Sequence, residues 1–325
     1  MNEITVKAPA TTSNLGAGFD ICGMALEEPF DFTTVRKIEK AKSKKSAAKS
    51  AENAEKTVIR NVGRYKAHED AKESVIAAVI KKMREDFRFK DGFEIIVEKN
   101  IRIKGGLGSS AAEATAVAYA LDKLYGLRLT REQLVYYASF GEGFAAGSRH
   151  LDNVSSCVFG GFNITYSHDP IKVKRINPPK DLECLLVMPA KEKESTKFAR
   201  SVLPETVPRK DALYNCFCLS KLIIGFVDGN VDLITRSLDD RIVEPARAKA
   251  GILPNLLELR EIGKKCGYGV AASGAGPTMI ALGSKKNADK KEFERKVGEL
   301  FAGTGMAAEL LWTKPSSEGA KAQKK

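Results

Sequence analysis

The sequence predicts a protein of mixed helices and strands in two domains, the second of them ferredoxin-like. Three observations predict this fold. At 325 residues the chain is long enough for two hydrophobic cores. Its second half contains strand, helix, strand, strand, helix and strand, which is the order of a split βαβ unit. Its first half contains a glycine-rich turn that opens an alanine-rich helix at Ser109. We place the boundary near residues 167–170, so the predicted domains are 1–169 and 170–325, the second with a basic tail at 313–325.

Spacing and capping residues predict the helices of the first half. Apolar residues at 75, 76, 79, 80 and 83 follow the helical period. The helix from Ser109 ends at Gly126, a typical C-terminal cap. Thr130 and Gln133 form a capping box for another helix, which we expect to run through Ser139. Strands are expected at 5–9, 32–35, 93–97 and 162–166, with a turn at 101–103.

Strands and helices of the second half follow one another at short intervals. Short apolar runs predict strands at 182–188, 268–272, 278–282 and 307–312. Helices are expected at 212–228, 254–266 and 287–301, and the helix at 254–266 is an addition to the ferredoxin-like order.

The glycine-rich turn has the composition of a phosphate-binding loop. Its glycines leave no side chains over the backbone amides, and free amides at a helix start attract anions. Serine hydroxyls beside them can hold phosphate oxygens or Mg²⁺. A plain tight connection is the alternative, and no Lys follows Gly108 as in the common nucleotide-binding loop. The candidate residues are Lys104, Gly105, Gly106, Leu107, Gly108, Ser109, Ser110 and Ala111.

Two further segments are candidates for a substrate site. Residues 9–20 form a polar, glycine-containing segment, and its Asn14 and Asp20 can accept hydrogen bonds from an amine or a hydroxyl. An ordinary turn is the alternative. Residues 141–153 hold Glu142, His150 and Asn153 among small residues. A single histidine is more often structural, but this clustering favours a site.

The composition limits the class of protein. Hydrophobic content of 43% and charged content of 29% are typical of a soluble globular protein. The sequence contains no apolar run of 18 residues, so we expect no membrane span. The strand-like pattern at the N-terminus predicts no signal peptide, and the six cysteines are expected to be reduced, so we expect a cytoplasmic protein.

The net charge of +12 invites a nucleic-acid-binding interpretation. Residues 37–56 carry seven Lys and three Glu, and residues 313–325 carry four Lys and one Glu. These two stretches hold more than half of the net charge, and neither has interleaved aromatic residues. We therefore expect solvated segments and no nucleic-acid partner, with an RNA-binding protein as the alternative class.

Three stretches, in this order along the chain, resemble the GHMP small-molecule kinases: residues 9–20, 106–111 and 273–278. The likeness extends over about residues 4–312. Within that family, four details are similar to the homoserine kinases: Asn-Leu-Gly-x-Gly-Phe-Asp at 14–20, His150-x-Asp152-Asn153 before Gly160-Gly161, Ser195-Thr196 with Ala199-Arg200 and Leu203-Pro204, and Asp240-Arg241-Ile242 with Glu244-Pro245 and Arg247.

The resemblance implies an α+β GHMP kinase fold, with a first domain like ribosomal protein S5 domain 2 and a ferredoxin-like second domain. It implies ATP on the glycine-rich loop, Mg²⁺ on Ser110 and Glu142, and L-homoserine as the phosphoryl acceptor. We also expect a homodimer. The residues that match substrate positions are Asn14, Asp20, His150, Asn153, Thr196, Arg200, Arg247 and Gly274. The two arginines suit a carboxylate, because a guanidinium binds it through two hydrogen bonds, and Asp20 suits an ammonium.

The chain departs from the family pattern at three positions. Arg102 and Lys104 stand where Pro and Gly are usual before the glycine loop, and Leu151 follows His150 where Pro is common.

At the reaction centre we expect Glu142, His150 and Asn153. Mevalonate-type relatives have an Asp base where this chain has Asn153, and an amide cannot take a proton. We therefore expect no strong base: the hydroxyl proton passes to phosphoryl oxygens or solvent, with His150 as the alternative acceptor. The other readings are a GHMP kinase for another small alcohol, such as mevalonate or pantoate, and an inactive ligand-sensing relative. The presence of Ser110 and Glu142 argues against the latter.

Overall fold

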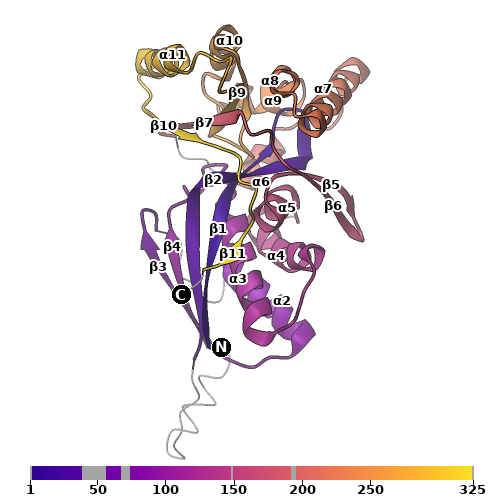
Figure 1. Cartoon of the computed structure of the whole chain (residues 1–325), viewed down its shortest axis with the longest axis vertical. Coiled ribbons are helices and arrows are strands. Elements are labelled where there is room, and N and C mark those ends of the chain that lie inside the picture. The colour runs from indigo at the N-terminus through magenta and orange to yellow at the C-terminus, as the bar shows by residue number, and fades with distance from the viewer. Residues whose placement is uncertain (1, 39–55, 67–73, 148, 192–194, 324–325) are drawn as a thin grey trace, which may run out of the picture.

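The computed structural model describes residues 2–38, 56–66, 74–147, 149–191 and 195–323. Two lobes, each built on one sheet, are stacked along the long axis of the molecule (Figure 1). Most of the lysine-rich stretch 37–56 lies outside the described residues, so its solvation stays a prediction.

The first sheet has seven strands, which are β1 (Glu3–Asn14), β2 (Gly18–Lys37), β3 (Thr57–Gly63), β4 (Phe93–Lys99), β5 (Phe162–His168), β6 (Ile171–Ile176) and β11 (Lys321–Ala322). Their order is β11-β1-β2-β4-β3, and the β5–β6 hairpin joins the sheet through β2. Only β3 and β4 pair in parallel among these strands. β1 is buried on alternate residues at first and then on every residue from Pro9, because its second half passes between the lobes.

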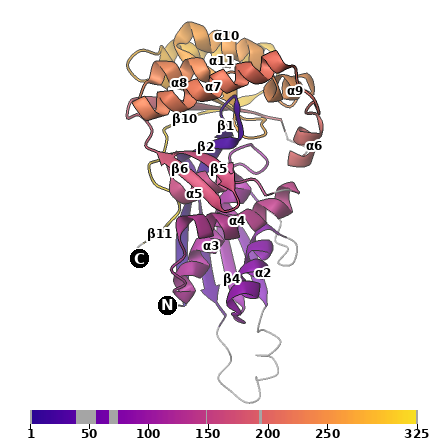
Figure 2. The same cartoon turned by 90° about the vertical axis from the view of Figure 1, so that its right-hand side faces the viewer.

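Helices cover one face of this sheet (Figures 1 and 2), namely α2 (Val75–Phe87), α3 (Ser109–Tyr125), α4 (Arg131–Ala146) and α5 (Asp152–Phe159). α3 packs on β1 and β2, and its many alanines are fully buried because small side chains allow a close approach to the sheet. The predicted start of α3, its Gly126 cap and the Thr130–Gln133 capping box are confirmed. α4 extends past the predicted end at Ser139, which places Glu142 on a helix.

The second sheet has four strands, which are β7 (Leu182–Pro189), β8 (Tyr268–Ala272), β9 (Met279–Ser284) and β10 (Ala308–Thr313). All neighbours are antiparallel in the order β10-β7-β9-β8, which confirms the ferredoxin-like arrangement. The helices of this lobe are α6 (Thr196–Ser201), α7 (Arg209–Asp228), α8 (Val231–Ser237), α9 (Val243–Lys249), α10 (Leu256–Cys266) and α11 (Lys290–Gly303). Sequence reasoning located α7, α10 and α11, and it missed the short α6, α8 and α9.

The chain changes from the first sheet to the second between β6 and β7. The predicted boundary near residue 170 lies inside the β5–β6 hairpin, whose two strands both belong to the first sheet. The division into two domains at that boundary stays a prediction, and the structure locates the change of sheet at residues 177–181.

The basic tail returns to the first lobe after β10. Its strand β11 pairs with β1 through Val6 and Lys7, and the amide of Gly161 donates to the carbonyl oxygen of Ser316 at 2.7 Å. The prediction of a solvated tail is therefore wrong for the described part of it, because this segment supplies the edge strand of the first sheet.

All six cysteines are free thiols, as predicted, and five are buried. Cys216 is the exception, because it lies on the exposed side of α7. No helix in the described parts of the chain is long and apolar enough to cross a membrane.

Candidate active site

The glycine-rich loop lies where the two lobes meet. Gly106 and Gly108 have positive φ angles of 84° and 64°. A Cβ atom on Gly108 would lie 1.9 Å from Oγ1 of Thr11, and one on Gly106 would lie 2.3 Å from the carbonyl oxygen of Ser273. Only glycine fits at these positions, because β1 packs closely on one side of the loop and the β8–β9 connection packs closely on the other.

Hydrogen bonds fix the loop against both neighbours. The amide of Thr11 donates to the carbonyl oxygen of Leu107 at 3.1 Å, and the hydroxyl of Ser273 donates to the carbonyl oxygen of Gly106 at 2.8 Å. Gly108, the N-cap of α3, has no side chain to cap the helix. In the described parts of the chain no side chain caps the first turn of α3, and uncapped amides at a helix start are suited to binding phosphate.

The side chains of the loop divide into two groups. Leu107 and Ala111 are fully buried, so they can reach a ligand only through their backbone. Lys104 is exposed, with a φ of 55°, and Ser109 and Ser110 are half-buried at the start of α3. Arg102, the departure from the family's proline, donates to the carbonyl oxygen of Pro189 at 2.8 Å and so ties the loop to the second lobe.

Ser110 and Glu142 form a pair of oxygen ligands beside this helix start. The hydroxyl of Ser110 donates to Oε1 of Glu142 at 2.5 Å, and Glu142 is buried on α4. Within the described residues, no three or more His, Cys, Asp or Glu side chains gather into a metal cage. Two hard oxygens next to a phosphate site fit Mg²⁺, which is usually held by one or two protein groups and by phosphates.

A buried cluster of charged residues, which sequence reasoning missed, contacts both ends of the glycine-rich loop. The Lys99 ammonium lies 2.8 Å from Oδ2 of Asp31 and 2.6 Å from Oε1 of Glu113. It also donates to the carbonyl oxygen of Ser109 at 3.2 Å. Burial alone would lower the pKa of Lys99, but the two carboxylates outweigh it and the pKa is raised. The other oxygen of Asp31 accepts from the amide of Ile101 at 2.8 Å, so the cluster anchors both ends of the loop.

The second group of predicted residues gathers around Arg200 of α6. Its guanidinium contacts both carboxylate oxygens of Asp20, at 2.5 and 2.7 Å, and Nδ1 of His150 at 3.0 Å. Burial lowers the pKa of His150, and the Arg200 charge lowers it further. His150 is therefore neutral near pH 7. The non-glycine Asp20 has a φ of 59°, the kind of strained backbone that is frequent at functional sites.

Arg247 lies beside this cluster and is buried on α9. Its guanidinium donates to the carbonyl oxygens of Ala199, at 3.2 Å, and Gly274, at 3.0 Å. Arg247 and Arg200 both lie against the ring of Phe19, 5.4 and 5.0 Å from its centroid. Burial, together with the charge of Arg200, lowers the pKa of Arg247 to about 10. Within the described residues no carboxylate forms an ion pair with Arg247, so its guanidinium can still pair with an anionic group.

Gly274 joins the two groups of residues. Its carbonyl oxygen accepts from Nδ2 of Asn14 at 2.6 Å as well as from Arg247. Oδ1 of Asn14 accepts from the amide of Asp20 at 3.2 Å. A Cβ on Gly274 would lie 3.1 Å from the carbonyl oxygen of Gly106 in the glycine loop. Gly274 thus lies between the glycine-rich loop and the residues around Arg200.

Asn153 occupies the space between these groups. Its Nδ2 donates to Oγ of Ser13 at 2.8 Å, and its Oδ1 accepts from Oγ1 of Thr11 at 2.8 Å. Asp152 accepts from the amide of Asn153 at 2.7 Å and from Nδ2 at 3.3 Å. These contacts fix the orientation of the Asn153 amide. Asp152 is buried, and burial together with the nearby Asp20 raises its pKa to about 6.

Thr196, another predicted substrate residue, lies on the same helix as Arg200. It opens α6 one turn before Arg200, is half-buried, and follows Ser195, whose hydroxyl accepts from the amide of Phe198 at 2.9 Å.

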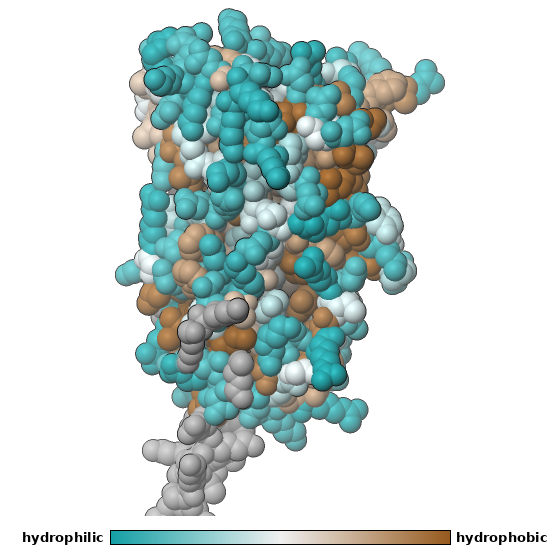
Figure 3. Space-filling model, viewed as in Figure 1, coloured by the Kyte–Doolittle hydropathy of each residue, from teal (hydrophilic) through white to brown (hydrophobic). Residues whose placement is uncertain are grey.

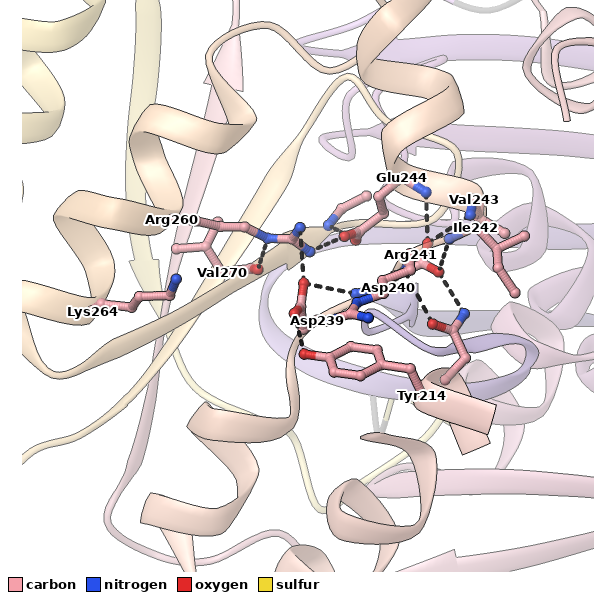
Figure 4. A network of polar contacts seen from close by, with 12 residues as sticks. Tyr214, Asp239, Asp240, Arg241, Ile242, Val243, Glu244, Arg260, Lys264 and Val270 are labelled. Atoms are coloured by element: carbon pink, nitrogen blue, oxygen red, sulfur yellow. Dashed lines mark hydrogen bonds and ion pairs between the residues drawn. The ribbon is translucent and has the colours of Figure 1, made fainter. Parts of the chain in front are cut away.

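A polar network holds α9, and with it Arg247, in position (Figure 4). Both oxygens of Asp240 accept backbone amides at the start of α9, including that of Glu244 at 2.6 Å. Glu244 accepts from the amide of Ala272 at 2.5 Å and forms an ion pair with Arg260. Burial raises the pKa of Glu244 to about 7. Ala272 lies two residues before Gly274, so this network fixes the position of α9 relative to Gly274.

Comparison with known proteins identifies the family of this chain. Residues 74–161 match the family model of the GHMP kinases N terminal domain, and residues 226–302 match that of the GHMP kinases C terminal. The homoserine kinase of Methanococcus maripaludis is 36% identical over 291 residues, which cover 88% of this chain and 90% of that protein. The homoserine kinase of Pyrococcus abyssi is 34% identical over 320 residues, with 97% and 98% covered. The crystal structure of homoserine kinase from Cytophaga hutchinsonii superposes with a TM-score of 0.86 at 29% identity, covering 99% of this chain and 98% of that one.

Proposed function

This chain belongs to the GHMP kinases, and we propose that it transfers the terminal phosphoryl group of ATP to the side-chain hydroxyl of L-homoserine. The products are O-phospho-L-homoserine and ADP, and the reaction belongs to threonine biosynthesis. The substrate assignment rests on one observation, the set of charged groups around Arg200. The guanidinium groups of Arg200 and Arg247 both lie against the ring of Phe19, and the carboxylate of Asp20 pairs with Arg200.

These charges suit a zwitterionic amino acid. In the free protein Asp20 and Arg200 bind each other. A substrate with an ammonium and a carboxylate replaces that ion pair by two new ones, so neither protein charge is left unpaired. Arg247 adds a second donor to the carboxylate, and His150 orients the same end of the substrate. We assign Asn14, Thr196 and Gly274 to the surrounding wall.

ATP is proposed to bind with its phosphates on the amides of residues 105–111, at the start of α3. Ser110 and Glu142 would hold Mg²⁺, which neutralises charge on the phosphates. Lys104 is exposed at the rim of the loop and can reach a phosphate oxygen.

Phosphoryl transfer requires positioning and charge neutralisation more than covalent chemistry. Asn153 lies at the junction of the two half-sites: a Cβ on Gly108 would be 3.1 Å from its Oδ1. Its amide accepts a hydrogen bond from the substrate hydroxyl and aims the oxygen at phosphorus. As the O–P bond forms and the bond to ADP breaks, the hydroxyl proton passes to a phosphoryl oxygen or to solvent. His150 contacts Arg200, so we assign it to orientation and not to proton transfer.

We further expect a cytoplasmic enzyme without a nucleic-acid partner, and we expect two copies to associate.

An ADP-release assay with homoserine, mevalonate, pantoate and shikimate tests the assignment, with mass spectrometry of the product. Two truncated alcohols sharpen it: 4-hydroxybutyrate lacks the amine, and 3-amino-1-propanol lacks the carboxylate. Homoserine should be the best substrate, and each truncated alcohol should lose at least about tenfold in kcat/KM, since each leaves one charge of the site without a substrate partner. Equal turnover of 4-hydroxybutyrate would overturn the role of Asp20, and faster turnover of mevalonate or pantoate would overturn the homoserine assignment.

A further inference from the structure

Arg102 joins the glycine-rich loop to the segment that leads to α6. Its guanidinium donates to the carbonyl oxygens of Pro189, at 2.8 Å, and Lys191, at 3.3 Å. Pro189 is the last residue of β7 and lies past the pairing of β7 with β9, which ends at Val187. Arg102 therefore supplies a hydrogen-bond donor at this end of β7. Because a charged donor makes a stronger hydrogen bond than a neutral one, this contact fixes the start of the loop against the second lobe.

Lys191 continues the connection to the two helices that carry the substrate arginines. Its ammonium donates to the carbonyl oxygen of Gly251 at 2.5 Å. Gly251 lies in the turn after α9, and the amide of the next residue, Ile252, donates to the carbonyl oxygen of Arg247 at 2.9 Å. Lys191 also precedes α6, the helix of Arg200. The glycine-rich loop is thus connected through Lys191 to the helices of both arginines.

The surroundings of this connection allow it to respond to a ligand. The loop also contacts the β8–β9 connection, where the hydroxyl of the fully buried Ser273 donates to the carbonyl oxygen of Gly106 at 2.8 Å. Arg102 is only half-buried, and Lys191 is exposed. Figure 3 shows many hydrophilic residues on the surface at the level where the lobes meet. The contacts of Arg102 and Lys191 can therefore adjust when a ligand binds, whereas the buried contact of Ser273 holds the loop in place.

We propose that Arg102 is a positioning residue that couples nucleotide binding to acceptor binding. A nucleotide with its phosphates on the loop restrains the loop at Arg102. The restrained guanidinium holds residues 189–191, and these hold α6 and α9 where they receive the acceptor. Coupling between two sites is reciprocal, so a bound acceptor strengthens nucleotide binding by the same factor. This role rests on the proposed function for the identity of both ligands, and Arg102 itself contacts neither.

Titration calorimetry with homoserine and the β,γ-imido analogue of ATP, in the presence of Mg²⁺, measures the coupling. In the wild type, each ligand should bind at least about fivefold more tightly when the other is present. Arg102→Met should remove most of this factor, while the affinity for each ligand alone stays within about twofold of the wild-type value. Arg102→Lys should keep part of the factor, because an ammonium can still donate to a carbonyl oxygen. Lys191→Met should lower the factor too. The double variant with Arg102→Met should lose no more than Arg102→Met alone, because the two residues act in one line of contacts.

Arg64→Met is the matched control. Arg64 also joins the lobes, through hydrogen bonds to both carboxylate oxygens of Glu309 on β10 at 3.1 and 3.0 Å, and these bonds involve neither the loop nor residues 189–191. This variant should keep the wild-type factor. The proposal is overturned if the wild type shows no coupling, or if Arg102→Met couples the ligands as strongly as Arg64→Met does. Weaker binding of the ATP analogue alone to Arg102→Met would also overturn it, since that result indicates a direct contact with the nucleotide.

Two further outcomes are separated from these. If homoserine does not bind, the homoserine assignment fails, and the same titrations with the alcohol that the ADP-release assay identifies decide the role of Arg102. If Arg102→Met does not fold, Arg102→Lys and Lys191→Met carry the test, and a wild-type factor in both would overturn the proposal.

Discussion

Asp20 and Arg200 form an ion pair that connects the lobes: Asp20 lies on β2 of the first sheet and Arg200 on α6 of the second lobe, with 2.5 Å between their nearest oxygen and nitrogen atoms. Both side chains are about one-third exposed, so the pair is open to a ligand. A substrate that separates the pair must supply both charges itself, and we therefore propose that the pair selects for amino acids.

Substrate binding should therefore be sensitive to Asp20 and Arg247. Asp20→Asn and Arg247→Ala should each raise KM for homoserine by more than about tenfold, because removing one partner of a desolvated charge pair costs about 2–5 kcal/mol. KM for ATP should change much less. Arg236→Ala, at an exposed arginine of α8, is the control. Wild-type KM for homoserine in both variants would contradict the charge assignment.

Glu142 should matter for turnover and not for acceptor binding. Glu142→Gln should lower kcat at least about tenfold at saturating ATP and raise the Mg²⁺ concentration needed for half-maximal rate, because a metal contact is worth several kcal/mol in the transition state. Glu132→Gln, in the first turn of the same helix, should behave as wild type. A normal kcat and an unchanged Mg²⁺ curve would remove Glu142 from the metal site.

The buried cluster behind the loop should be important for stability. Lys99→Met leaves the carboxylates of Asp31 and Glu113 unpaired, and such a loss typically costs about 3–5 kcal/mol in the free energy of unfolding. The triple variant with Asp31→Asn and Glu113→Gln should recover part of this loss. Lys264→Met, at the exposed ion pair with Glu261, should cost under about 1 kcal/mol. Urea unfolding measures all three, and a harmless Lys99→Met would show that the cluster contributes little.

Stability should depend on the protonation of Asp152. Its folded-state pKa of about 6 is raised above the ordinary value, so the stability that it contributes is fully present below about pH 4 and is lost as the pH rises through about 6. Asn at position 152 cannot ionise, so the free energy of unfolding of Asp152→Asn should rise relative to that of the wild type as the pH increases from about 4 to above 6. The relative gain should be about 3 kcal/mol at most, since one pKa unit is about 1.4 kcal/mol. Urea unfolding at pH 4.5 and 7.5 checks the sign, and parallel curves for the two proteins would contradict it.

Removing residues 314–325 should destabilise the first lobe. The truncation exposes the edge of β1 at Val6 and Lys7. It also removes the backbone that packs on Gly160, where an added Cβ would lie 2.4 Å from the backbone of Glu318. We expect the melting temperature to fall by several degrees, whereas a chain that lacks only residues 324–325 should melt as wild type. Equal melting temperatures would indicate that β11 contributes no stability.

Much of the fold could be predicted from local pattern. The glycine-rich turn and the Gly126 cap located α3, and short apolar runs located the strands of the second sheet, three of which are buried on every residue. α6, α8 and α9 have six or seven residues, too few to show a period. The pairing of β11 with β1 was also beyond the sequence, since two residues of strand carry no pattern and their partner is more than 300 positions away.

The site was predicted as a set of residues but not as a geometry. The resemblance to the homoserine kinases brought Asp20, Arg200 and Arg247 into one proposal, but their mutual contacts depend on how the two lobes pack against each other. The position of Lys99 in the sequence could have predicted the buried charge cluster. It continues the buried alternation of Phe93, Ile95 and Val97 along β4, and a lysine in such a position requires buried carboxylates as partners.

The return of β11 to the first sheet has a consequence for biosynthesis. A ribosome delivers β1 first and β11 only after the whole ferredoxin-like lobe, so the free edge of β1 stays open for nearly the entire time of translation. An unpaired edge is a template for pairing with other chains. The edge of β1 is therefore available for pairing with other chains until β11 has been synthesised and has folded back onto it.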